Sequence, residues 1–217
     1  MPSDPKRPLL RIEGKDDKFA LATLLTRHDI NYDSKPWPAN YPEFIESGGV
    51  TEMLDGMKLS IEAAGRNPIG FVLDADSPLQ NRWEAVCDRL REVGFKPPSI
   101  PPADGFCEYT KKHKTTVGVW LMPDNQQDGK LETFLRTLID ENDGLIEHAT
   151  ASTRQAKELG SRFSDPNSEK AVLHAWLAWQ EEPGCPFGTA IKARFFTHES
   201  PAAAGFVDWF KRLYKIS

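Results

Sequence analysis

The chain has 217 residues, of which 39% are hydrophobic and 27% charged, and its formal net charge is −5 at pH 7. This length allows one α/β domain with an extension, or two small domains, and the composition excludes a disordered chain. The acidic balance argues against the large basic surface typical of nucleic-acid-binding proteins, although ions bound at acidic metal sites would cancel part of that charge.

The start of the chain contains no hydrophobic stretch that could serve as a signal peptide, and residues 1–7 are predicted to form a flexible arm. No hydrophobic run approaches the roughly 20 residues needed to span a bilayer. We therefore expect a cytoplasmic protein with no membrane partner. The three cysteines, Cys87, Cys107 and Cys185, are too few and too scattered for a disulfide framework or a zinc site.

The first half of the chain alternates strand and helix patterns. The hydrophobic periodicity predicts a strand, a helix, a short strand, a helix, a strand and a helix over residues 9–12, 16–25, 44–45, 50–64, 69–73 and 82–93. The continuous hydrophobic run 69–73 is typical of a central parallel strand covered on both faces. Phe19 and Leu59 fall on the predicted buried faces of the first two helices.

The second half is predicted to add two strands and then mainly helices. These elements are expected over residues 106–110, 116–122, 131–139, part of 140–160, 169–179 and 202–214. The order of elements is typical of an α/β fold with an open, mostly parallel sheet flanked by helices. We expect the α/β core over residues 8–145 and a mainly helical C-terminal extension, packed on the core, over residues 146–217.

Carboxylates follow two of the predicted strands. Glu13 comes directly after the strand 9–12, and Asp74 and Asp76 come after the strand 69–73. The carboxyl ends of parallel strands meet at one edge of a sheet, so we expect these side chains to converge there. Asp74 and Asp76 are two residues apart and would point the same way on an extended segment, where they repel each other unless a cation lies between them. Oxygen ligands of this kind suit a hard divalent cation; the structural alternative is aspartates that cap the following helix.

The segment after Glu13 has features that suit a phosphate. Gly14 allows the backbone to approach a phosphate closely, and Lys15 could contact one, although it could equally be a solvated lysine. Asp16 and Asp17 are expected to cap the first helix or to interact with its dipole rather than to bind metal.

The two acidic segments, Ile12-Glu13-Gly14-Lys15-Asp16-Asp17 and Leu73-Asp74-Ala75-Asp76, resemble the two signatures of the Toprim fold. Topoisomerases, bacterial primases, recombination proteins and nucleases of the OLD (overcoming lysogenization defect) family share that fold. The segments 117–125 and 129–132 further resemble small bacterial Toprim-like proteins related to the OLD-family nucleases, a group with proposed roles in phage defence. The resemblance covers about residues 8–140.

The resemblance implies roles for five side chains. Glu13 would transfer a proton at the phosphodiester and help to bind metal, and Asp74 and Asp76 would hold Mg²⁺, with Mn²⁺ as the alternative ion. Glu132 resembles an additional acidic metal ligand of the nucleases, and Lys170 resembles a catalytic lysine that stabilises charge on the phosphorane oxygens. For Glu132 the alternative is a favourable interaction with a helix dipole, and for Lys170 it is a solvated lysine at the start of a helix.

The chain departs from the larger Toprim families, because it has no ATPase domain, no tyrosine in an evident topoisomerase setting and no zinc-ribbon cysteines. Simple phosphodiester hydrolysis of DNA or RNA is therefore the activity that we expect. One alternative is a phosphatase of the haloacid dehalogenase type, against which Ser77-Pro78 and the late position of the aspartate pair both count. The other is a non-catalytic module that binds nucleic acid or a protein partner in a defence or toxin–antitoxin complex.

The last third of the chain carries aromatic and basic residues with weaker signals. The aromatic side chains at helical spacing are expected to form the core between two helices rather than to stack on bases; they are Trp176, Trp179, Trp209 and Phe210. His174 is expected to pack against its neighbours. Lys192 and Arg194 are candidate phosphate contacts on the basis of charge alone.

Overall fold

The computed structural model describes residues 7–217 and contains one five-stranded sheet with the strand order β2-β1-β3-β5-β4. The strands are β1 (Leu9–Ile12), β2 (Glu43–Glu46), β3 (Ile69–Asp74), β4 (Phe106–Thr110) and β5 (Thr115–Met122). β4 lies at one edge and pairs antiparallel with β5, whereas the other pairs are parallel. The predicted α/β fold with an open, mostly parallel sheet is confirmed. Most of the predicted N-terminal arm lies outside the described residues.

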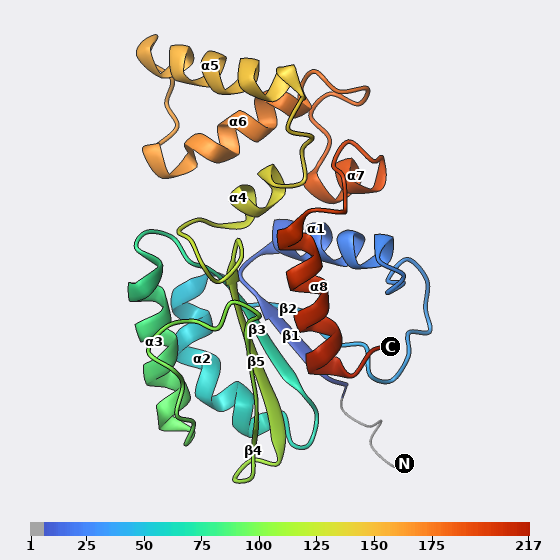
Figure 1. Cartoon of the computed structure of the whole chain (residues 1–217), viewed down its shortest axis with the longest axis vertical. Coiled ribbons are helices and arrows are strands. Elements are labelled where there is room, and N and C mark those ends of the chain that lie inside the picture. Colours follow the sequence, from blue (N-terminus) through green and yellow to red (C-terminus); the bar gives the residue numbers. More distant parts are fainter. Residues whose placement is uncertain (1–6) are drawn as a thin grey trace.

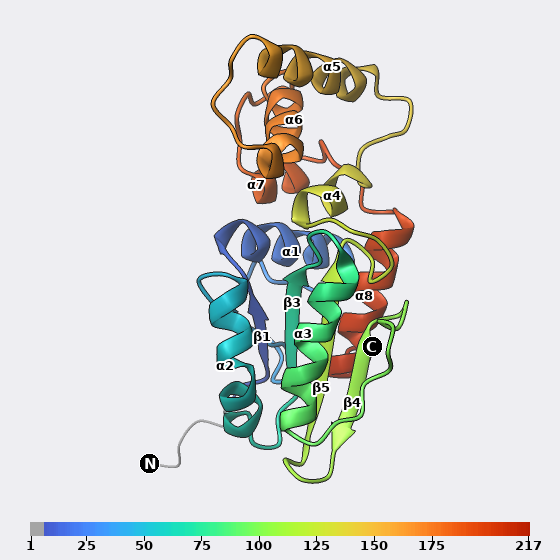
Figure 2. The same cartoon turned by 90° about the vertical axis from the view of Figure 1, so that its left-hand side faces the viewer.

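Helices cover both faces of the sheet and continue beyond one end of it (Figures 1 and 2). They are α1 (Lys15–Arg27), α2 (Val50–Ala63), α3 (Leu79–Glu92), α4 (Leu131–Arg136), α5 (Gly144–Glu158), α6 (Ser168–Leu177), α7 (Phe187–Lys192) and α8 (Pro201–Tyr214), with a 3₁₀ turn at Asp165–Asn167. α1 and α8 pack on one face, and α2 and α3 on the other. α4 to α7 form a lobe beyond the carboxyl ends of the parallel strands (Figure 2).

The alternation of side chains along β3 explains these two layers. Val72 belongs to the hydrophobic cluster of α1 and α8, whereas Phe71 and Leu73 belong to the cluster of α2 and α3. Successive residues of a strand point to opposite faces, so a strand with hydrophobic residues at every position must be covered on both sides. All of these side chains are buried, as the continuous hydrophobic run predicts.

The C-terminal helix α8 lies directly on the sheet because two glycines make room for it. Gly70 and Gly118 are paired across β3 and β5. A Cβ atom at Gly118 would lie 2.5 Å from a methyl carbon of Leu213, and one at Gly70 would lie 2.6 Å from the hydroxyl oxygen of Tyr214. The same hydroxyl donates a 2.6 Å hydrogen bond to the carbonyl of Leu9. The end of the chain thus completes a layer of the α/β core, so the helical extension does not lie apart from it.

Several local expectations are wrong. Phe19 and Leu59 are 51% and 71% exposed, because the buried stripe of α1 lies at Ala20, Leu21, Leu24 and Leu25 and that of α2 at Met53, Met57 and Ile61. The helix α7 was missed, since a loop rich in proline and glycine precedes it. Trp179 is 43% exposed, whereas the other three aromatic residues predicted to form core, Trp176, Trp209 and Phe210, are buried.

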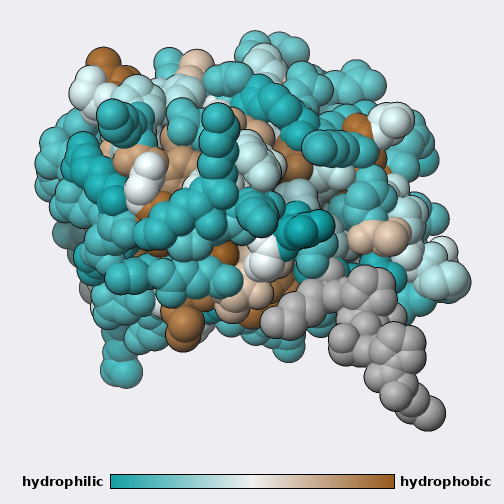
Figure 3. Space-filling view, turned by 90° about the horizontal axis from the view of Figure 1, so that it is seen from below, coloured by the Kyte–Doolittle hydropathy of each residue, from teal (hydrophilic) through white to brown (hydrophobic). Residues whose placement is uncertain are grey.

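The surface at the lower end of Figure 1 is mostly hydrophilic, and hydrophobic residues show there as scattered patches (Figure 3). None of the helices formed by residues 7–217 combines the length and hydrophobicity required to cross a bilayer.

Candidate functional site

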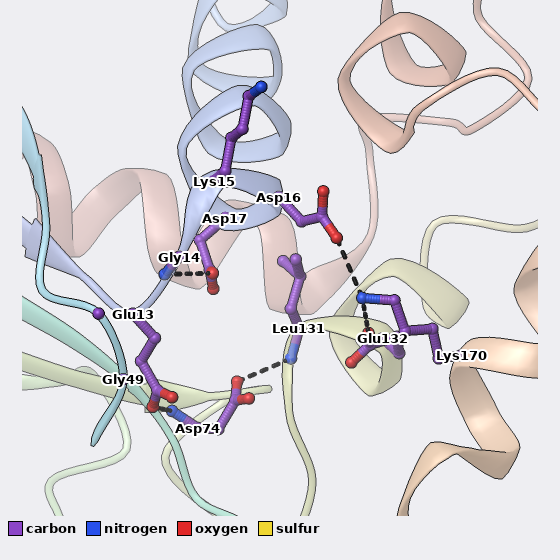
Figure 4. A pocket seen from close by; sticks show the side chains of 11 residues that line it. Glu13, Gly14, Lys15, Asp16, Asp17, Gly49, Asp74, Leu131, Glu132 and Lys170 are labelled. Carbon is purple, nitrogen blue, oxygen red and sulfur yellow. Dashed lines mark hydrogen bonds and ion pairs between the residues drawn. The ribbon is translucent and has the colours of Figure 1, made fainter. Parts of the chain in front are cut away.

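A cavity of about 490 Å³ opens where β1 and β3 end and α1 and α4 begin (Figure 4). It is lined by Glu13, Gly14, Lys15, Asp16, Asp17, Gly48, Gly49, Asp74, Leu131, Glu132 and Lys170. Four of the five predicted site residues therefore surround one space: Glu13, Asp74, Glu132 and Lys170. The cavity lies at the carboxyl ends of neighbouring parallel strands, where α/β sheets commonly bind ligands.

Glu13 and Asp74 are linked across the two strands. The Oε1 atom of Glu13 accepts a 2.8 Å hydrogen bond from the backbone N–H of Asp74. The Oδ1 atom of Asp74 in turn accepts a 2.9 Å hydrogen bond from the N–H of Leu131, the first residue of α4. Each carboxylate has a second oxygen without a hydrogen bond to the described residues. The backbone thus fixes both groups while it leaves acceptor oxygens free for a ligand.

Asp17 brings a third carboxylate to the cavity. Its Oδ2 atom accepts a 3.0 Å hydrogen bond from the N–H of Gly14, so the capping role expected from the sequence is confirmed. Figure 4 also shows this side chain directed toward Glu13 and Asp74. The place of Asp17 in the lining of the cavity was not predicted. Its position in the sequence contained a signal for this: Asp17 lies in the first turn of α1, which begins just after β1, so its side chain lies at the same edge of the sheet as Glu13.

Burial and mutual repulsion raise the pKa values of these acids. Burial raises the pKa of Asp17 to about 7, and the negative charges of Glu13 and Glu132 act in the same direction. Burial, and then the charges of Glu13, Asp17 and Glu132, raise the pKa of Asp74 well above its usual range. Burial also raises the pKa of Glu13, although the N–H of Asp74 and the charge of Arg82 oppose the shift. Burial therefore makes the charged form of each of these acids costly.

Lys170, from α6 in the helical lobe, supplies a cation that pairs with two acids of the cavity. Its Nζ atom lies 3.0 Å from Oδ2 of Asp16 and 3.6 Å from Oε1 of Glu132, which is itself buried. Burial lowers the pKa of Lys170, but the hydrogen bond to Asp16 and the charge of Glu132 outweigh it, and the net shift is upward. Lys170 is thus a charged side chain at the rim of the cavity rather than a freely solvated one. Asp16, which positions it, was not predicted to have this role.

Asp76 does not join the cluster. The strand ends at Asp74, and Asp76 has a positive φ of 55°, so the expectation that the two side chains point the same way is wrong. Its Oδ2 atom accepts a 2.5 Å hydrogen bond from the guanidinium of Arg82, and it lines a different surface cavity with Asp128 and Lys130. Its predicted role as a metal ligand would require this carboxylate to leave Arg82.

Comparison with known proteins identifies a family whose function is unknown. A family model described as "Protein of unknown function (DUF3226)" matches residues 7–215, which is nearly the whole chain. The chain belongs to the DUF3226 family. No curated protein and no solved structure matches it. The match of this DUF3226 chain extends through α8, in agreement with the packing of that helix on the sheet.

The donor set of this DUF3226 site suits a hard divalent cation in its chemistry. The acidic groups that line the cavity offer carboxylate oxygens, and burial first, then the repulsion between neighbouring carboxylates, raises the pKa values of Asp17 and Asp74. Between residues 7 and 217, however, no three His, Cys, Asp or Glu side chains stand close enough together to form a ready-made metal cage. The carboxylates of Glu13, Asp17, Asp74 and Glu132 line one cavity but do not form a closed ligand shell.

Proposed function

We propose that this DUF3226 member is a Mg²⁺-dependent phosphodiester hydrolase that acts on DNA or RNA, with the Toprim-like site arrangement suggested by its two acidic segments. One observation carries the proposal. Glu13 directly follows β1 and Asp74 ends β3, and the carboxylate of Glu13 accepts a hydrogen bond from the backbone N–H of Asp74 inside a cavity where acids outnumber bases. Carboxylates gathered in this way destabilise a folded chain unless a bound cation or a proton compensates them.

The proposed roles follow from position. Asp74 would hold the ion, with Glu132 and Asp17 completing its oxygen ligands. A divalent ion bound there would neutralise phosphate charge and polarise the scissile bond. Glu13 would accept a proton from the attacking water as the new P–O bond forms, and the leaving oxygen would gain a proton from solvent as the old bond breaks. Its pKa is raised by burial, which brings it closer to the neutral range in which a general acid–base group works best.

Lys170 would act on the phosphate rather than on the ion. Its charged Nζ is held at the cavity rim by Asp16 and Glu132, from which it can reach a phosphate oxygen that gains negative charge in the transition state. Lys15, exposed at the start of α1, is a second cation at the same cavity.

The experiment compares purified wild-type protein with Glu13→Gln on labelled single- and double-stranded DNA and RNA, in Mg²⁺, in Mn²⁺ and in EDTA. Glu62→Gln, on the exposed surface of α2, is a matched control for the loss of one carboxylate. We expect cleavage by wild type and Glu62→Gln in the presence of metal, and a loss of at least about 100-fold in Glu13→Gln. Equal cleavage by Glu13→Gln, or cleavage in EDTA, would contradict the proposal.

A non-catalytic module that binds nucleic acid or a protein partner, in a phage-defence or toxin–antitoxin complex, is the second candidate. The pairing of Asp76 with Arg82 favours it, because one acid of the Asp-x-Asp motif is already neutralised by the protein itself. Under this candidate no substrate is cleaved, and Mg²⁺ leaves the melting temperature unchanged. A phosphatase would instead hydrolyse small phosphomonoesters, which the same assay can include. We propose a cytoplasmic location for either role.

A further inference from the structure

A second cavity, of about 270 Å³, lies at the far end of α1 from the acidic site and has the opposite charge character. It is lined by Thr23, Thr26, Arg27, Asp33, Lys192, Arg194 and His198. Three cationic side chains and a histidine thus face a single carboxylate. α7 and the segment that follows it form the other wall, and Figures 1 and 2 both place α7 beside α1.

Arg27 is built into the wall of this cavity. Its NH1 donates hydrogen bonds to the carbonyls of Ile191 and Phe196, at 3.2 and 2.6 Å, and its NH2 lies 2.8 Å from Nδ1 of His198. Nδ1 of His198 accepts this hydrogen bond, because a guanidinium can only donate. No carboxylate pairs with Arg27 among the described residues. Burial lowers the pKa of Arg27 and the nearby charge of Arg194 lowers it further, whereas the charge of Glu199 acts in the opposite direction.

The two remaining cations stand at the mouth of the cavity. Arg194, just after α7, has a positive φ of 66°, and its side chain makes no hydrogen bond or ion pair within residues 7–217. Lys192 forms one exposed ion pair with Asp33, at 3.3 Å. A surface pair of this kind contributes little energy, so an anionic ligand can compete for Lys192. Both side chains are exposed and available to a ligand.

A third cavity connects the acidic site with the basic one. It shares Lys15 and Asp16 with the former, and Thr23, Asp33 and Lys192 with the latter. Lys15, Phe19 and Thr23 recur every four residues and therefore lie along one face of α1. Gly188 of α7 keeps this path narrow, since a Cβ atom there would lie 2.9 Å from Phe19.

We infer that the face of α1 from Lys15 to Thr23, together with Lys192 and Arg194, is a track that binds the phosphates of a single nucleic-acid strand whose scissile phosphate occupies the acidic site. This inference rests on the proposed function and adds its substrate class. Asp16 and Arg27 are separated along α1 by about 16 Å at 1.5 Å per residue. A strand must therefore extend several nucleotides beyond the cleaved bond to contact both ends of the track.

Phe19 explains why the strand is single. Its ring is 51% exposed in the middle of the track, and Nζ of Lys15 lies 5.9 Å from the ring centre. An exposed aromatic ring flanked by cations suits stacking with an unpaired base beside its phosphate, a contact worth about 1–3 kcal/mol per base. Bases within a duplex are stacked on each other and cannot make this contact.

The test measures binding in EDTA, where no metal-dependent cleavage occurs, by fluorescence anisotropy at about 50 mM salt. The probes are labelled oligothymidylate, oligouridylate and a duplex, each about 12 nucleotides long. The test variant is K192Q/R194Q. The matched control is K58Q/R66Q, which removes the same charge from exposed positions outside the track. Arg194→Gln alone serves as a second variant if the double variant melts at a lower temperature, because the Arg194 side chain has no partner to lose.

We expect K192Q/R194Q to bind both single strands about tenfold more weakly than wild type. The slope of the logarithm of the binding constant against the logarithm of the salt concentration should also be less steep, by roughly 0.7 for each lost phosphate contact. K58Q/R66Q should bind as wild type does, and the duplex should bind more weakly than either single strand. The inference would be overturned if wild type did not bind the single strands, or if K192Q/R194Q bound them as tightly as wild type does. If K192Q/R194Q alone lost binding, but wild type cleaved no substrate in Mg²⁺, the proposed hydrolase activity would be contradicted and the inferred strand-binding track would be supported.

Discussion

The carboxylates on the two sides of the carboxyl end of β3 are in opposite electrostatic states. On the cavity side, Asp74 lies with Glu13 and Asp17, and their pKa values are raised by burial and repulsion. On the other side, Asp76 pairs with Arg82, and Asp128 accepts hydrogen bonds from Ser77 and Leu79. The hydrogen bond from the Ser77 hydroxyl, followed by that from the N–H of Leu79, lowers the pKa of Asp128.

This difference separates acids that stabilise the fold from acids that would bind the ion under the proposed function. The second group holds together the loops around Asp76 and Asp128, and each member stabilises the fold as a charged group. The first group destabilises the metal-free fold as charged groups, because each loses hydration and repels its neighbours. Local arrangements that destabilise the fold in this way occur mainly at functional sites. The contrast therefore points to Asp74, rather than to the Asp-x-Asp pattern as a whole, as the centre of the site.

Asp74→Asn should have the largest effect of any change on either side. It keeps the hydrogen bond from Leu131 but removes the charge that would hold the ion, so we expect at least a 100-fold loss of nuclease activity, or about 3 kcal/mol of transition-state stabilisation. Asp128→Asn is the matched control from the other side and should retain most activity. Equal losses in the two variants, measured as initial cleavage rates, would break the distinction between the two groups.

Asp74→Asn and Asp128→Asn should also differ in stability: the variant that loses activity should be the more stable one without metal. In EDTA at pH 8, Asp74→Asn relieves repulsion and should raise the free energy of unfolding by about 1–3 kcal/mol, which corresponds to a melting temperature higher by several degrees. Mg²⁺ should raise the melting temperature of wild type and not that of Asp74→Asn, because an ion bound only to the native state stabilises it by mass action. Asp128→Asn should lower stability and keep the Mg²⁺ response. A metal-free Asp74→Asn protein that is less stable than wild type would show that Asp74 is a structural acid.

The sequence predicted the sheet and the edge that carries the site, because both depend on local patterns. The continuous hydrophobic run before Asp74 specified a central strand, and parallel pairing then placed Glu13 and Asp74 side by side. The positions of Glu132 and Lys170 at the same cavity also agree with the resemblance on which they were predicted.

What the sequence could not give depends on backbone detail and on distant contacts. Asp76 departs from the expected direction because the strand ends two residues earlier and Arg82, a full turn into α3, takes its carboxylate. Asp16 gains its role only through Lys170, which lies 154 residues away. The basic cavity likewise requires α7, a helix that the proline and glycine residues before it concealed.

The pH dependence of stability should sharpen the contrast further. The pKa of Asp17 is about 7 in the folded protein against an ordinary value of 3.8, so between these values the folded state binds more protons than the unfolded state. Its contribution to stability is therefore present at low pH and is lost as the pH rises through about 7. In EDTA the melting temperature of wild type should rise from pH 8 to pH 5 more than that of Asp17→Asn, which can keep the hydrogen bond from Gly14. Burial lowers the pKa of His28 and acts oppositely, but it does so equally in both proteins. Parallel curves for the two proteins would contradict the raised pKa.

Asp76→Asn should have the smallest effect. The side chain is 48% exposed, and Arg82 keeps its 2.9 Å hydrogen bond to the carbonyl of Asp74 when the ion pair is lost. A surface pair of this kind contributes about 0–1 kcal/mol, so stability should fall by no more than that and activity by less than about tenfold. The decisive measurement is the Mg²⁺-dependent rise in melting temperature, which Asp76→Asn should retain. If that rise disappears, Asp76 must leave Arg82 to bind the ion, and the Asp-x-Asp motif acts as a unit, as its resemblance to the Toprim signature implies.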